Sequence, residues 1–148
     1  MKNPRINNST DAGRIALCES WAEHIEMTFA DKTYGANTWF NSSNSLYHTY
    51  IQWLENQRNE KTDHIPIGFY HDLIDGINTS ETAGDGYWGN QNTGTIDDNV
   101  SGLTNAQLFS LLDNTVTSPA AFVNKLNNSG FITGANTIVD VNDLFNSY

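Results

Sequence analysis

The sequence predicts a mainly α-helical protein, a single helical domain of about six helices with one long irregular loop. Apolar residues recur at helical spacing in several segments, and the segments of the C-terminal third begin with helix-capping patterns. The strand-like runs FIT and TIV are too short to build a sheet alone. Because the chain has 148 residues and no internal repeat, we expect residues 1–148 to share one core.

The first predicted helix covers about residues 11–32, with Thr10 or Asp11 at its start and Gly35 after its end. A stripe at helical spacing, flanked by Trp21, contains Ile15, Cys18, Ala22, Ile25 and Phe29. Such a stripe is typical of a helix face that packs on the core. We therefore expect Cys18, the only cysteine, to be a buried and unreactive thiol.

Two more helices are predicted in the first half of the chain. One lies in SLYHTYIQWLENQ, residues 45–57, and has an apolar side. The other begins near Pro66, presents an apolar stripe that includes Phe69 and Tyr70, and ends near Gly76. Residues 77–102 then show no period. A loop of this length is often functional, so Tyr87 and Trp88 are candidate binding residues.

Capping patterns predict the three C-terminal helices. Thr104 and Gln107 form a capping box, with a hydrophobic staple between Leu103 and Leu108. Pro119 follows Ser118 at the start of the next helix, for which Gly130 is the stop. The last helix is predicted to use Asp140 and Asp143 as its cap, with a staple between Val139 and Leu144.

Charge and motifs exclude several classes of function. The 17 acidic and 7 basic residues give a net charge of -10, which repels nucleic acid and anionic membranes. No stretch approaches the roughly 20 apolar residues of a membrane span, and the N-terminus has no signal-peptide pattern. The four histidines never form HExxH, and no G-x-S-x-G elbow or phosphate loop occurs. We expect His48 and His71, each beside a tyrosine, to be partly buried and hydrogen-bonded rather than metal ligands.

The first helix also has an acidic edge, formed by Glu19, Glu23 and Glu26. A helical wheel places Glu19 about 95° from the centre of the apolar stripe, at the border of the expected core, and His24 on the other side. Two readings fit this geometry. The edge is either a solvated acidic surface or the position of one carboxylate with a chemical role.

A family resemblance favours the second reading. The segments ESWAEHIEMTFADKTYG, YHTYIQWLE, IPIGFYHDLIDG and DDNVSGLTNAQLFSLL resemble the C-terminal part of zincin-like (HExxH) bacterial metallopeptidases of the Bacteroidetes type, over most of residues 19–112. In that family an HExxH helix comes first, and a later E-[SG]-W/F-A helix supplies the third zinc ligand. The resemblance implies that Glu19 is this ligand and that Trp21 and Ala22 pack beneath it.

The resemblance also assigns roles to three aspartates. Asp72, Asp75 and Asp98 would hold neighbouring turns together by capping or through a calcium ion, since oxygen ligands in loops suit calcium. For Asp72, the alternative of an exposed helix carboxylate without such a role is equally well supported. A secreted or cell-surface location and a protein or peptide substrate are further implications.

The absence of HExxH is the main departure from the family. Two zinc ligands and the general base are missing, so we expect this chain to be inactive by itself, either as the C-terminal piece of a longer secreted peptidase or as a relic. The N-terminal half of a longer protein, or a second copy, is then the expected partner, and an exposed apolar face on the first helix would be its sign. The alternative is a small acidic extracellular binding module that uses Tyr87 and Trp88.

Overall fold

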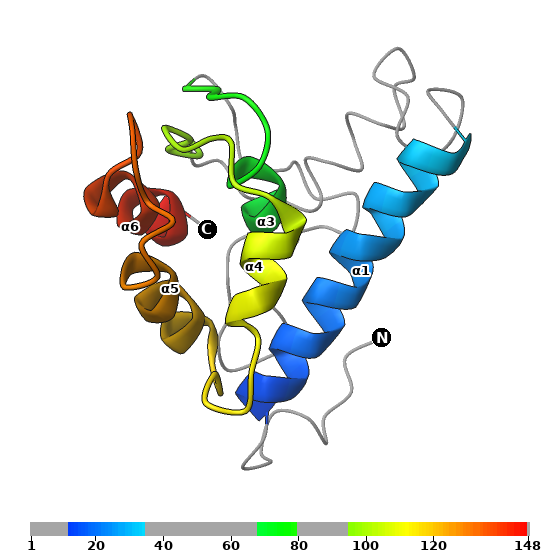
Figure 1. Ribbon diagram of the computed structural model, residues 1–148. Coiled ribbons are helices and arrows are strands. Elements are labelled where there is room, and N and C mark those ends of the chain that lie inside the picture. Colours follow the sequence, from blue (N-terminus) through cyan, green and yellow to red (C-terminus); the bar gives the residue numbers. More distant parts are fainter. Residues whose placement is uncertain (1–11, 35–67, 80–94, 148) are drawn as a thin grey trace.

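A computed structural model of the chain describes residues 12–34, 68–79 and 95–147 (Figure 1). Its helices are α1 (Ala12–Tyr34), α3 (Gly68–Asp72), α4 (Asn105–Leu111), α5 (Pro119–Asn127) and α6 (Ile138–Ser147). The mainly α prediction is confirmed. The helix expected at residues 45–57 and the binding candidates Tyr87 and Trp88 lie outside the described residues.

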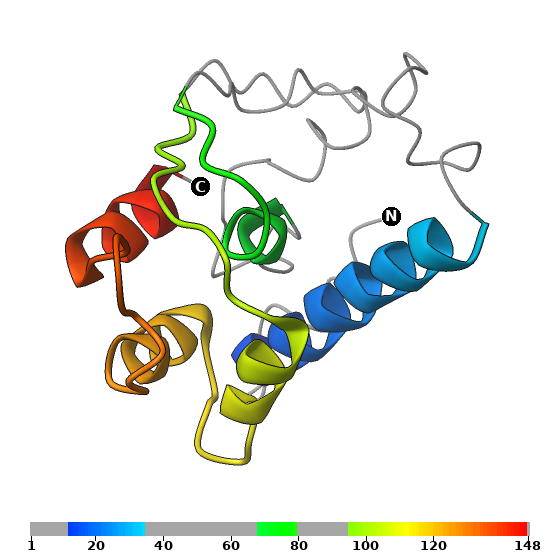
Figure 2. The ribbon, with the colours of Figure 1, turned by 45° about the horizontal axis from the view of Figure 1, so that its top comes forward.

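The described helices pack around one core. Figures 1 and 2 show α1 on one side, α5 and α6 on the opposite side, and α3 and α4 between them. All five helices contribute buried apolar side chains, from Leu17 of α1 to Phe145 of α6. Phe69 of α3 packs against Phe145 with ring centroids 5.5 Å apart. Among the described helices, none is long and apolar enough to cross a membrane.

The starts of α4 and α5 match the capping predictions. The hydroxyl of Thr104 accepts a hydrogen bond from the Gln107 amide, and the Gln107 side chain accepts one from the Thr104 amide at 2.9 Å. Leu103 and Leu108, the predicted staple, are both buried. Ser118 caps α5, with Pro119 in its first turn. These patterns satisfy amide groups that a helix start leaves without partners.

The predicted cap of α6 is wrong by one helical turn. The helix begins at Ile138, and Thr137 and Asp140 exchange hydrogen bonds in the manner of a capping box. Asp140 therefore occupies the third position of the helix instead of its cap. Val139 is 63% exposed, so the expected staple to Leu144 does not form. Thr137 was the better cap because its hydroxyl reaches the amide of Asp140 at 3.1 Å.

The segment after α3 is held by the segment before α4. Helix α3 is shorter than predicted, and its C-terminal side continues as a turn. The amide of Leu103 donates to the carbonyl of Leu73 at 3.0 Å, and the amide of Gly102 donates to the carbonyl of Ile74 at 3.2 Å. Gly102 has a φ of 79°, which favours glycine. The described end of the predicted loop is thus anchored to the core.

Candidate functional site

Helix α1 packs on the molecule through a face that mixes apolar and polar side chains. Leu17, Ser20 and His24 are buried there, and Trp21 is half-buried. These spacings of three and four residues place all four side chains on one side of the helix. We call them the inward face. Near its start, Gly13 lies so close to the loop before α5 that an added Cβ would be 2.4 Å from the Thr117 carbonyl oxygen.

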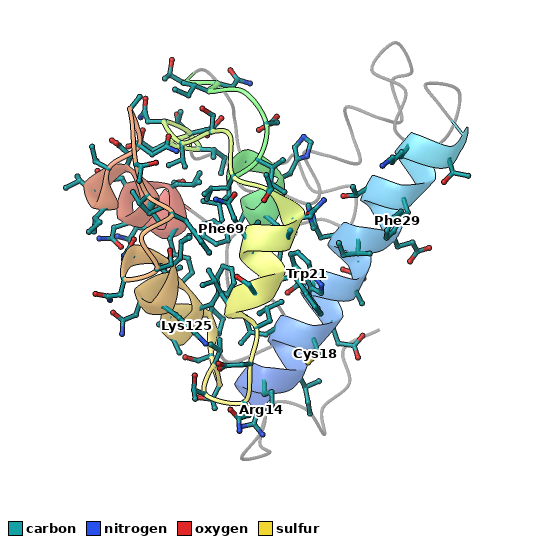
Figure 3. All side chains as sticks on the ribbon, viewed as in Figure 1. Arg14, Cys18, Trp21, Phe29, Phe69 and Lys125 are labelled. Atoms are coloured by element: carbon teal, nitrogen blue, oxygen red, sulfur yellow. The ribbon has the colours of Figure 1, made fainter. Side chains whose placement is uncertain are left out.

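The apolar stripe predicted to face the core points outward instead. Phe29 is 59% exposed, and Cys18 and Ala22 are exposed, while Ile15 and Ile25 are half-buried. The prediction that Cys18 is buried is therefore wrong. We call this stripe the outward face, and Figure 3 labels Cys18 and Phe29 along it. The helical period identifies an apolar stripe, but it does not determine which neighbour covers it.

Hydrogen bonds satisfy the buried polar groups of the inward face. Nε2 of His24 lies 2.7 Å from Oδ1 of Asn105 in α4. The hydroxyl of Ser20 donates to the carbonyl of Leu17 and lies 3.4 Å from the hydroxyl of Tyr70 in α3. Because Ser20 uses its proton on Leu17, the Tyr70 hydroxyl is the donor in the second contact. The inward face is thus joined to α3 and α4 by specific polar contacts.

Trp21 lies between the buried side chains of the inward face, which with Tyr70 we call the buried cluster, and the surface. Its ring meets Tyr70 edge-on, with centroids 5.4 Å apart, and stacks on Phe109 of α4 at 5.9 Å. Phe109 is itself 62% exposed. Helix α4 therefore lies along one edge of the outward face, beside Trp21.

The buried cluster is electrically neutral at neutral pH. Burial lowers the pKa of His24, against the raising effect of its hydrogen bond to Asn105, and nearby His71 lowers it further. A neutral ring donates from Nε2 to the Asn105 oxygen. Burial also raises the pKa of the Tyr70 hydroxyl, which therefore keeps its proton. These groups hold the helices together as neutral hydrogen-bonding partners.

Glu19, the predicted zinc ligand, lies on the exposed side of α1. Its side chain is exposed, as is that of Glu26, and both flank the outward face. Among the described residues, no group of three or more His, Cys, Asp or Glu side chains is placed to hold a metal ion. Glu19 is accessible to a ligand from outside, but the described residues do not assemble a zinc site around it.

The three predicted aspartates occupy different environments. Asp72 is buried, so the alternative of an exposed helix carboxylate is wrong. Asp98 is also buried and accepts a hydrogen bond from the Asn78 amide at 2.8 Å, which joins two loop segments. Burial raises the pKa of Asp98. Asp75 is exposed and lies 3.3 Å from half-buried His71, four residues earlier. The contact with Asn78 supports loop fixation by Asp98, while that role for Asp72 and Asp75 and a calcium ion remain predictions.

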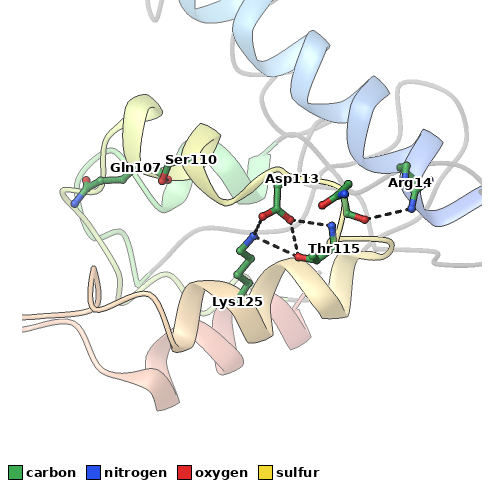
Figure 4. A network of polar contacts seen from close by, with 7 residues as sticks. Arg14, Gln107, Ser110, Asp113, Thr115 and Lys125 are labelled. Atoms are coloured by element: carbon green, nitrogen blue, oxygen red, sulfur yellow. Dashed lines mark hydrogen bonds and ion pairs between the residues drawn. The ribbon is translucent and has the colours of Figure 1, made fainter.

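A surface network fixes the connection between α4 and α5 (Figure 4). Asp113 lies 2.6 Å from Nζ of Lys125 and accepts hydrogen bonds from Thr115. The Lys125 contact, followed by those from Thr115, lowers the pKa of Asp113. Arg14 of α1 donates to the carbonyl of Asn114 in the same loop at 3.5 Å. These contacts hold the connection between α4 and α5 in place. Among the described residues of the network, we see no feature of a catalytic site.

Comparisons of this chain with protein-family models, curated proteins and solved structures gave no match. The resemblance to metallopeptidases therefore stays a prediction that depends on the sequence segments quoted above.

Proposed function

We propose that this chain is a helical docking subdomain that binds another polypeptide through the outward face of α1. The observation that supports this most directly is the 59% exposure of Phe29 on the same stripe as exposed Cys18 and Ala22. Apolar side chains that a helix leaves exposed along one stripe are the kind of surface that a partner can cover. Burying one such phenylalanine side chain stabilises a complex by about 1.5–3 kcal/mol.

The inward face explains why α1 leaves this stripe outside. Ser20 and His24 each have a hydrogen-bonding partner in the orientation observed. Turning the helix to bury the outward face would expose Leu17 and separate these pairs, and a buried polar group without a partner costs about 1–3 kcal/mol. The orientation of α1 is therefore stable, and its outward face is available for docking.

Within this proposal, the resemblance gives Glu19 a specific role. A catalytic zinc site uses three protein ligands and an open position. The described residues include no group of three possible metal ligands at this surface, so with Glu19 as one ligand the other two ligands and the general base would come from the docked polypeptide. A zinc ion held there would polarise the scissile carbonyl of a peptide. The subdomain would contribute one ligand and a packing surface, and it would be inactive alone.

The alternative function, a binding module built on Tyr87 and Trp88, concerns residues outside the described ranges. No described residue favours it over docking through α1. It remains a prediction from the sequence.

Size-exclusion chromatography of native extracts from the source cells tests the docking function. We expect the chain to elute in a larger species, and Ala22→Asp to shift it to the size of the isolated chain, because a charge then faces the apolar partner. Ala120→Asp, an exposed alanine on α5, is the matched control and should leave elution unchanged. Circular dichroism should show both variants folded. Elution of folded Ala22→Asp with the larger species would contradict the proposal.

An activity assay tests the claim that the zinc site is incomplete. We expect no cleavage of casein by the purified chain, with or without added zinc. Zinc-dependent cleavage that Glu19→Gln abolishes would show that the site is complete within this chain. The docking function is tested separately, by the size-exclusion chromatography.

A further inference from the structure

We propose that the occupant of the outward face is an amphipathic helix with a basic edge, belonging to another polypeptide. This inference rests on the proposed docking function and specifies its partner. The outward face alternates spacings of three and four residues, and its members are Ile15, Cys18, Ala22, Ile25 and Phe29. Alternating spacings of three and four place side chains at the a and d positions of a coiled-coil seam.

The side chains of this seam suit a partner helix that approaches closely. Cys18 and Ala22 in the middle of the seam are small and exposed. Ile15 and Phe29 lie at its two ends, and exposed Phe29 can insert between side chains of the facing helix. Helix–helix distances depend on the side chains at the contact, and small central residues permit a short one.

The charge on the two edges of the seam selects the partner. Glu19 and Glu26 each follow a d position directly, which places them at the e positions of one edge, and both are exposed. On the other edge, Trp21 packs against Phe109 and Tyr70, so α4 already borders it. A docking helix therefore meets two carboxylates along the open edge. The net charge of -10 adds longer-range attraction for a basic partner.

A second copy of this chain fits the seam poorly. In an antiparallel pair, the edge with Glu19 and Glu26 would face the same edge of the copy, and like charges would repel. In a parallel pair, Glu26 would face Trp21 of the copy, which has no charge and already packs on Phe109. Glu19 would face Arg14 of the copy, whose guanidinium already donates to the carbonyl of Asn114, so that only one of the two glutamates would meet a basic side chain. Lysine or arginine at the facing positions of a different helix would pair with both glutamates.

Three synthetic helical peptides test the inference with the unmodified protein. They share one apolar stripe of leucine and isoleucine and differ only in having lysine, glutamine or glutamate along the edges. Binding is measured by fluorescence anisotropy of the labelled peptides at 0.05 and 0.5 M salt, with a scrambled-stripe peptide as control. We expect the lysine peptide to bind about tenfold more tightly than the glutamine peptide at low salt, and the glutamate peptide to bind most weakly. Salt should reduce these differences because it screens exposed charges.

Two double variants, each of which removes two negative charges, show which carboxylates cause the preference for the lysine peptide. Glu19→Gln with Glu26→Gln should bind the lysine and glutamine peptides equally. Asp97→Asn with Asp143→Asn, which removes two exposed charges from the other side of the core, should keep the preference. Equal binding of lysine and glutamine peptides by the unmodified protein would overturn the basic-edge inference while docking stands. Failure of all stripe peptides to bind would overturn both.

Discussion

Helices α1 and α5 differ in which of their faces packs on the core. In α5, Phe122, Val123 and Leu126 are buried, and the apolar face is the packed face. In α1, the packed face includes Ser20 and His24, while Phe29 is largely exposed. Helix α5 thus packs its apolar face on the core, whereas α1 packs a mixed face on the core and leaves apolar side chains exposed. We infer that these exposed side chains of α1 serve a partner.

Specific hydrogen bonds distinguish the internal interface of α1. His24 pairs with Asn105 and Ser20 with Tyr70, each within hydrogen-bonding distance. Apolar contacts tolerate small rotations of a helix, but such pairs are lost when the donor and acceptor move apart. The polar contacts therefore fix which face of α1 points outward.

The same substitution at the two helices should give the largest contrast. Phe122→Ala removes a fully buried ring that packs edge-on against Tyr70 at 5.5 Å, and should lower the free energy of unfolding by about 3–5 kcal/mol. Phe29→Ala should change it by less than about 0.5 kcal/mol, because the ring is already exposed to water. Urea denaturation of both purified variants measures the difference. Losses of similar size would show that Phe29 is part of the core.

A smaller effect is expected from the Tyr70 hydroxyl. Tyr70→Phe keeps the ring and removes the donor to Ser20, so the free energy of unfolding should fall by about 1 kcal/mol. Ser20→Ala removes the other partner. Because both changes delete one contact, the double variant should lose less than the sum of the single losses. Strictly additive losses would contradict a direct interaction between the two hydroxyls.

The pH dependence of stability should be the smallest of these effects. Burial holds the pKa of His24 below its ordinary value of 6.5, so below that pH the unfolded chain binds a proton that the folded chain excludes. The contribution of His24 is therefore complete above pH 6.5 and declines as pH falls toward the folded-state pKa. His24→Gln, which can still hydrogen-bond, should decline less between pH 6.5 and 5 in urea titrations. The raised pKa of Asp98 acts in both proteins and does not affect the comparison. Identical slopes would show that folding does not lower the pKa of His24.

Local signals predict the starts of α4 and α5 correctly because the capping partners are three residues apart, as in Thr104 and Gln107. The orientation of α1 could not be predicted in this way. Its partners lie far along the chain: Asn105 is 81 positions after His24, and Tyr70 is 50 positions after Ser20. Nothing in the helical period indicates that these polar pairs form. The helical period therefore predicts that the apolar stripe of α1 faces the core, whereas Cys18, Ala22 and Phe29 of this stripe are exposed in the structure.

The candidate site was partly visible in the sequence. The acidic edge with Glu19 was predicted to be either solvated or functional, and its exposure is compatible with both readings. The alternating spacing of the stripe and the glutamates beside it were already present as a coiled-coil pattern. What the sequence lacked was the contact between Trp21 and Phe109, which closes one edge and leaves the other open.

The reactivity of Cys18 tests the two-faced description of α1 most directly. Cys18 is the only cysteine and is exposed on the outward face. Ser20→Cys in a Cys18→Ser background places the single thiol on the inward face instead. We predict that a thiol reagent such as DTNB modifies Cys18 in the folded protein nearly as fast as in urea, and the inward thiol far more slowly. Slow modification of Cys18 in the folded protein would show that its outward face is covered by the chain itself and would contradict the account.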